Sequence, residues 1–142
     1  MNTIAQDTAR APETPAIGAQ DALALGGRLL LAALFILAGI GKLGAAEGTI
    51  GYIASTGMPF AEAIYYATIA LEIGGGLLLA VGFKTRSVAA VLGLFSIACA
   101  VIFHADFADQ MQFTSFLKNL AIAGGMFQVA AFGAGRLALT RD

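Results

Sequence analysis

The residues best suited to chemistry are a few polar side chains in or beside long apolar segments. They are Glu72, Lys42, Lys118, Asn119, His104 and Asp106. Glu72 lies near the centre of the stretch from Ala63 to Phe83, where it is the only charged residue. A carboxylate in the middle of a bilayer is costly unless another group neutralises or solvates it. The sequence therefore predicts a partner for Glu72 within the fold.

Two lysines are candidates for that partner. Glu72 with Lys42 or Lys118 would form a buried ion pair, and the alternative is a neutral carboxyl group. Two interpretations of Glu72 remain open. It either fixes the register of the helices, or it handles protons or binds a polar head group.

For two of the remaining polar residues, a structural and a functional interpretation are likewise both open. His104 is either an interfacial hydrogen-bonding residue or a site residue, and Asn119 either bonds across helices or contributes to the site. We predict Glu72 and His104 as catalytic residues. The predicted ligand-binding residues are Lys42, Lys118, Asn119 and Asp106.

Several kinds of cofactor site are not indicated. His104 with Asp106 falls short of a metal ligand set, because the chain has one His and the pair has no Cys partner. A single His also excludes bis-His haem ligation within the chain. No phosphate-binding motif is present, and the single cysteine, Cys99, excludes a disulfide within the chain.

The composition indicates an integral membrane protein of one domain. Of 142 residues, 58% are hydrophobic and 12% are charged, whereas a soluble domain has about half and about a quarter. The mean hydropathy is +0.82. The long segments offer no polar outer face, which a soluble helical protein would need. The net charge of -1 says nothing about nucleic acid, but no basic stripe is present, so no nucleic-acid partner is expected.

Four apolar segments predict an all-α, four-helix bundle in the membrane, occupying residues 22–139. The expected spans are 23–43, 63–83, 88–103 and 115–132. Residues 1–21 are polar and are expected to form a mobile tail rather than a secretory signal, because no basic cluster precedes an apolar run.

Three connections separate the expected spans. Residues 44–59 predict a loop or a short amphipathic piece, with a turn signal at Gly57-Met58-Pro59. Residues 84–86 form a basic turn, and residues 109–114 are expected to be a polar loop. In the first span, Arg28 and Lys42 fall on one helix face. Both are expected to anchor the ends of the span, and a role in a polar interior is equally open for Lys42.

The basic residues predict an orientation. Four spans place one group of basic residues on one side, comprising Arg10, Arg28, Lys84, Arg86, Arg136 and Arg141. Lys42 and Lys118 fall toward the other side. By the positive-inside rule, both termini are cytoplasmic. The polar residues at the opposite ends of the spans are then brought together, with Glu72 deeper in the bundle.

At these residues the chain resembles the DoxX family of small four-span bacterial membrane proteins. The resemblance rests on motifs in order, which are Gly27-Arg28-Leu29-Leu30, Phe35-Ile36-Leu37-Ala38-Gly39-Ile40-Gly41-Lys42-Leu43, Met58-Pro59, Glu72-Ile73-Gly74-Gly75-Gly76, Gly82-Phe83-Lys84-Thr85-Arg86, Ile102-Phe103-His104, Phe116-Leu117-Lys118-Asn119-Leu120 and Gly133-Ala134-Gly135-Arg136. At Ala138-Leu139-Thr140 the chain departs from the usual family ending.

The resemblance implies an inner-membrane location and a link to redox metabolism, including quinone reduction and oxidative-stress defence. One hypothesis is therefore a redox-linked protein that binds a quinone or similar lipophilic molecule, with a partner protein supplying electrons. The alternative is a non-catalytic scaffold, assembly factor or small-solute carrier, in which the polar cluster only locks the bundle. Small-residue helix faces make a homo-oligomer plausible in either case.

Overall fold

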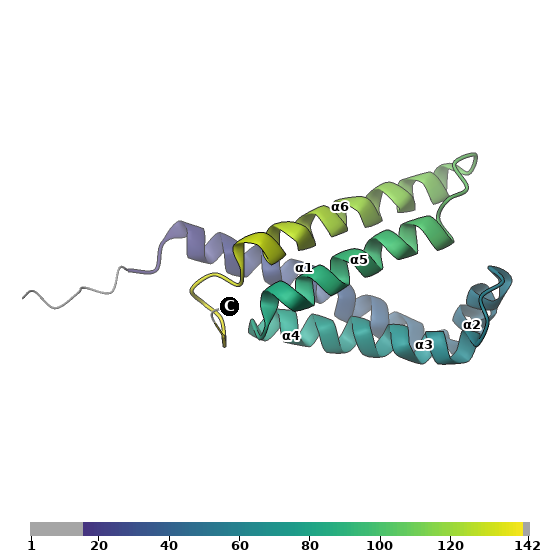
Figure 1. The fold of residues 1–142 in the computed structure, drawn as a ribbon, viewed down its shortest axis with the longest axis horizontal. Helices are drawn as coiled ribbons and strands as arrows, with labels where there is room; N and C mark the ends of the chain where they lie inside the picture. The colour runs from purple at the N-terminus through teal and green to yellow at the C-terminus, as the bar shows by residue number, and fades with distance from the viewer. Residues whose placement is uncertain (1–15, 141–142) are drawn as a thin grey trace, which may run out of the picture.

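The computed structural model describes residues 16–140, which are helical throughout except for short connections and the C-terminal segment (Figure 1). The elements are α1 (Ala19–Gly44), α2 (Ala46–Ser55), α3 (Ala61–Ile69), the π-helical segment η1 (Ala70–Gly74), α4 (Gly75–Val81), α5 (Thr85–Phe103) and α6 (Gln110–Phe132). Among these described residues, three helices are long and apolar enough to cross a membrane: α1, the continuous helix Ala61–Val81, and α5. The prediction of an all-α membrane protein is therefore confirmed.

The helices form two pairs that meet at one end of the molecule. α1 lies along η1 and α4, while α5 and α6 pack against each other along their length. α4 contacts α5 and α1 contacts α6, which joins the pairs, but α3 makes few contacts with α5. Figure 1 shows the pairs diverging toward the end where α2 lies. The bundle is thus closed at the end that carries the C-terminal segment and open at the α2 end.

Glycines allow the first pair to pack closely. A Cβ atom added at Gly76 would lie 2.7 Å from Ile36 Cγ1 and 3.1 Å from the Ala32 carbonyl oxygen. A Cβ at Gly39 would lie 2.6 Å from Ile73 Cγ1. Gly76, four residues after Glu72, therefore admits the backbone of α1, because only a hydrogen fits there.

Two clusters of buried side chains stabilise this arrangement. The cluster between the two pairs contains Ala32, Phe35, Leu79, Ala89, Leu92 and Met126. The smaller cluster, near α2, contains Ile53, Tyr65 and Ile69. Most other large apolar side chains are exposed. This is the distribution expected of helices that face lipid rather than water.

Arg28 is not the membrane-edge anchor that the sequence suggested. Its side chain is 2% exposed and donates hydrogen bonds to the carbonyl oxygens of Ala134 and Leu137, the latter at 2.7 Å. The guanidinium group thereby satisfies backbone carbonyls that follow α6. The prediction that Arg28 and Lys42 share one helix face holds, but that face points inward. Sequence alone could not distinguish an inward cation from one that snorkels.

Backbone hydrogen bonds also hold the C-terminal segment against the turn between α4 and α5. The backbone N–H groups of Leu139 and Thr140 donate to the carbonyl oxygens of Val81 and Gly82, both at 3.0 Å. Gly82 has a left-handed backbone (φ 72°), and a Cβ there would lie 2.6 Å from that of Ala138. Glycine is therefore required at position 82 for two separate reasons.

Several predicted boundaries differ from those observed. The predicted polar loop over 109–114 is wrong, because α6 begins at Gln110. The Asp109 side chain caps it by accepting hydrogen bonds from the N–H groups of Met111 and Gln112. Residues 44–59 do contain a short helix, α2. α1 begins at Ala19 and α5 at Thr85, each earlier than expected. Residues 1–15 of the expected tail, with Arg10, and Arg141 lie outside the described residues.

Candidate functional site

Lys42 and Glu72 form an ion pair on the inward face of the first helix pair. Lys42 Nζ lies 2.8 Å from Glu72 Oε1 and 2.9 Å from Oε2, so both carboxylate oxygens accept a hydrogen bond. The Glu72 side chain is 6% exposed and the Lys42 side chain 30% exposed. The predicted partner for Glu72 is therefore Lys42, and the role of Lys42 in a polar interior is confirmed. Lys118 is not the partner.

The local fold fixes both members of the pair. Lys42 follows Gly39 by three residues, so both lie on the α1 face that approaches η1. Glu72 lies within η1, and single π-helical turns in membrane and soluble helices frequently occur at functional sites. The Tyr65 hydroxyl donates to the Lys42 carbonyl oxygen at 3.0 Å, which ties α3 to the last turn of α1.

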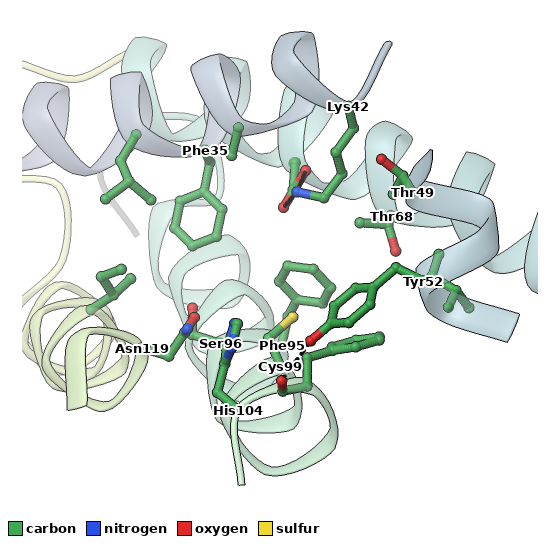
Figure 2. Close-up of a pocket in the computed structure, with 16 residues that line it drawn as sticks. Phe35, Lys42, Thr49, Tyr52, Thr68, Phe95, Ser96, Cys99, His104 and Asn119 are labelled. Atoms are coloured by element: carbon green, nitrogen blue, oxygen red, sulfur yellow. Dashed lines mark hydrogen bonds and ion pairs between the residues drawn. The ribbon is translucent and has the colours of Figure 1, made fainter. Parts of the chain in front are cut away.

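The pair faces a cavity of about 280 Å³ in the open part of the bundle. Its lining comprises Leu34, Phe35, Ala38, Lys42, Thr49, Tyr52, Ile53, Thr68, Glu72, Phe95, Ser96, Cys99, Phe103, His104, Asn119 and Ile122. Figure 2 shows Lys42 reaching in from α1, with Ser96, Asn119 and His104 on the opposite wall. Every helix except α4 contributes side chains to the lining of this cavity. A largely apolar wall with a few convergent polar groups is typical of a small-molecule site.

His104 lies at the end of α5, on the wall opposite Lys42. Its Nδ1 atom lies 2.6 Å from the side-chain oxygen of Gln112, on the first turns of α6. An amide oxygen only accepts hydrogen bonds, so this contact assigns the proton to Nδ1. The Nε2 atom is then available for a second hydrogen bond in either protonation state.

The other predicted site residues divide between the cavity and the surface. Asn119 lines the cavity, and its side-chain N–H donates to the Ser115 carbonyl oxygen of its own helix at 3.0 Å rather than across helices. Lys118 and Asp106 are exposed and do not line the cavity. Asp106 instead accepts a hydrogen bond from the Ala108 N–H in the turn before α6. The structure therefore brings together four of the six predicted residues.

Several lining residues had not been predicted. Thr68 precedes Glu72 by four residues, and Ser96, Cys99 and Phe103 follow one another at helical spacing along α5. That spacing places them on one helix face, which is a signal available from the sequence. Cys99 is half-buried and lines the cavity.

Tyr52 links α2 to α5 at the edge of the cavity. Its hydroxyl donates to the Phe103 carbonyl oxygen at 2.8 Å, and the two rings lie 5.6 Å apart between centroids. This contact closes part of the gap between the diverging helix pairs. No three His, Cys, Asp or Glu side chains within residues 16–140 are grouped to hold a metal ion.

Comparison with known proteins places the chain in a family. The DoxX family profile matches residues 23–105. The inner membrane protein YqjF of Escherichia coli is 37% identical over 122 residues, which cover 86% of this chain and 92% of YqjF. The inner membrane protein YphA of the same organism is 30% identical over 128 residues, covering 87% and 91%. No solved structure matches.

These relatives agree with the helices described above. Both are inner membrane proteins and align along nearly their whole length. Three helices of the described chain are suited to crossing a bilayer. The protein is accordingly a multi-pass protein of the bacterial inner membrane, in contact with the lipid bilayer, and it belongs to the DoxX family.

Proposed function

We propose that the protein binds a quinone, or a similar lipophilic molecule with a polar ring, in the cavity beside Lys42 and Glu72. The observation that carries this proposal is the ion pair on the wall of a cavity set among apolar helices. At about 280 Å³, the cavity is close to the lower end of ligand-pocket volumes. It is suited to a single ring rather than to a large head group.

The polar groups are complementary to ring oxygens. The Lys42 ammonium group has three N–H bonds, of which two are directed to Glu72, so one is left for a ligand. His104 Nε2 and the Asn119 side-chain oxygen are further polar atoms of the opposite wall. A ligand between these walls would accept a hydrogen bond from Lys42 and form a second hydrogen bond with His104.

The redox role is the second part of the proposal. Reduction of a quinone to a quinol takes up two electrons and two protons. Glu72, a carboxylate in the ion pair, and His104 would each take up a proton from water and pass it to a ring oxygen, since both are titratable groups that line the cavity. A partner protein would donate the electrons. The family resemblance, rather than the geometry, favours this redox link.

The proposed topology has four spans with both termini in the cytoplasm. α6 has 23 residues, so it is about 35 Å long, enough to cross the hydrocarbon core. It packs along α5, one of the apolar helices. Arg28, Lys84, Arg86 and Arg136 lie at the closed end of the bundle, which favours a cytoplasmic position for that end. The cavity would then open toward the periplasm.

The test is to purify the protein from its native membrane under mild conditions and to identify extractable small molecules by mass spectrometry. An ultraviolet-visible spectrum would be recorded in parallel. Wild type is expected to retain a quinone that Glu72→Gln and His104→Ala lose. Lys118→Gln is the matched control, because Lys118 is a charged α6 residue beside Asn119 that lies outside the cavity.

The scaffold hypothesis predicts a different result. If the ion pair only locks the helices, Glu72→Gln destabilises the protein, and neither wild type nor any variant carries an extractable ligand. A charge exchange between Lys42 and Glu72 would then restore full function. An empty, colourless wild type would overturn the proposed function, and self-association through the glycine-rich faces would become the leading alternative.

A further inference from the structure

A second cavity, of about 280 Å³, adjoins the first between α3 and α5. Four residues line both cavities, namely Thr68, Phe95, Cys99 and Phe103. The rest of its lining is apolar and comprises Met58, Ile64, Ala67, Leu71, Ala98 and Ile102. The two cavities therefore share one wall. The first holds the charged and polar groups, and the second has almost none.

The position of the second cavity follows from the divergence of the two helix pairs. α3 and α5 make few contacts, because α5 packs against α4 and then leaves the first pair. Ala67 on α3 and Ala98 on α5 line the gap, and both are exposed in the isolated chain. In a bilayer this surface faces lipid. Small side chains on both helices thus leave an opening at the level of the apolar segments.

A third cavity, of about 350 Å³, continues along the same seam toward the closed end of the bundle. Leu71 lines both the second and the third cavity. Gly74 also lines the third, and a Cβ added there would meet no atom within 4 Å. An apolar groove therefore runs along the seam of α3–α4 with α5, and it begins beside the polar cavity.

We propose that this groove holds the apolar chain of the ligand whose polar ring occupies the first cavity, and that the ligand enters sideways from the bilayer between α3 and α5. This inference rests on the proposed function and narrows its ligand class. The ligand is a ring compound with a long isoprenoid or alkyl chain, not a tailless, water-soluble ring. Burial of each chain methylene would add to its affinity.

The test compares two probes, decylubiquinone with a ten-carbon chain and tetramethylbenzoquinone without one. Ala67→Phe and Ala98→Phe each place a ring in the groove without entering the polar cavity, because neither alanine lines that cavity. Ala63→Phe is the matched control on α3, since Ala63 is also exposed but lines none of the three cavities. Dissociation constants are measured by calorimetry in lipid nanodiscs.

The groove variants are expected to weaken decylubiquinone binding by about tenfold or more and to change tetramethylbenzoquinone binding by less than about twofold. The control variant Ala63→Phe is expected to leave the dissociation constants of both probes unchanged. Groove variants that weaken neither probe, or both equally, would overturn this inference while leaving the proposed function intact. If wild type binds neither probe, both the proposed function and this inference are wrong. Ala67→Leu, a smaller change with the same expected direction, replaces any Phe variant that does not fold.

Discussion

Lys42 Nζ donates hydrogen bonds to both carboxylate oxygens of Glu72, at 2.8 Å and 2.9 Å, across the interface between α1 and η1. The contact joins residues thirty positions apart in the sequence. It neutralises Glu72, the only charged residue between Ala63 and Phe83, and it also places an ammonium group on the wall of a cavity. The pair therefore has a structural role in addition to the binding role that we propose for it, and the first prediction separates the two.

Removal of one partner should destabilise the fold, whereas exchange of the two should restore it. We expect Glu72→Gln to lower the free energy of unfolding by about 2 kcal/mol, less than for a fully buried pair because Lys42 is partly exposed. The double variant Lys42→Glu with Glu72→Lys should recover most of this loss. Thermal unfolding in a mild detergent measures both effects.

The same double variant discriminates between the two roles. Its ligand binding should remain impaired even where stability returns, because the cation then projects from η1 instead of α1. Full recovery of both properties would indicate that only the pairing matters, and the site would have to be sought elsewhere.

Two glycines on α1 should respond in opposite ways to the same substitution. Gly39→Ala should destabilise the protein by about 1–3 kcal/mol, because the new methyl group would overlap Ile73 and force α1 away from η1. Gly41→Ala is the control, since a Cβ there meets no atom within 4 Å. It should leave stability unchanged or raise it slightly, as alanine favours helix. Equal effects of the two would contradict the close approach at Gly39.

Arg28 should control the order of the C-terminal segment. Arg28→Lys keeps the charge but loses the planar group that reaches several carbonyl oxygens at once, among them those of Ala134 and Leu137. We expect faster hydrogen exchange at the Leu139 and Thr140 amides, which donate to Val81 and Gly82. Leu30→Ala serves as control, because Leu30 is 75% exposed. Unchanged exchange in Arg28→Lys would show that the segment is held without the guanidinium group.

Tyr52→Phe should loosen the contact between α2 and α5. The ring contact with Phe103 remains, but the hydroxyl hydrogen bond is lost. A net value of about 1 kcal/mol corresponds to roughly fivefold more frequent opening. The rate at which a small thiol reagent modifies Cys99, which lines the cavity, should rise by that factor.

The control for that measurement is Tyr66→Phe. Tyr66 is exposed, and its hydroxyl has no hydrogen-bond partner within residues 16–140. Equal Cys99 labelling in wild type and Tyr52→Phe would show that α2 does not limit access to the cavity.

The proposed orientation is tested by labelling single cysteines in a Cys99→Ala background. A cysteine at Ala108, in the turn before α6, should react with an impermeable maleimide applied to intact cells made permeable only at the outer membrane. A cysteine at Lys84, in the turn before α5, should react only after lysis. The reverse pattern would place the termini in the periplasm. Labelling of both cysteines on intact cells would exclude a single membrane crossing by α5 between them.

Hydrophobic length and isolated charges allowed the sequence by itself to determine the helical class, the membrane setting and the need for a partner at Glu72. These features are local, since they depend on composition over about twenty neighbouring residues. The capping of α6 by Asp109 was also readable, because Asp is a preferred N-cap. It was missed because the polar residues that follow resemble a loop.

The tertiary structure alone decided which charges pair. Lys42 and Lys118 were equivalent candidates until the packing of α1 against η1 selected Lys42 and left Lys118 exposed. Likewise, an inward and an outward Arg28 look the same in sequence, since only the fold supplies the carbonyl oxygens it binds. The cavities arise because two helix pairs diverge, and interhelical angles depend on contacts between residues far apart in the chain.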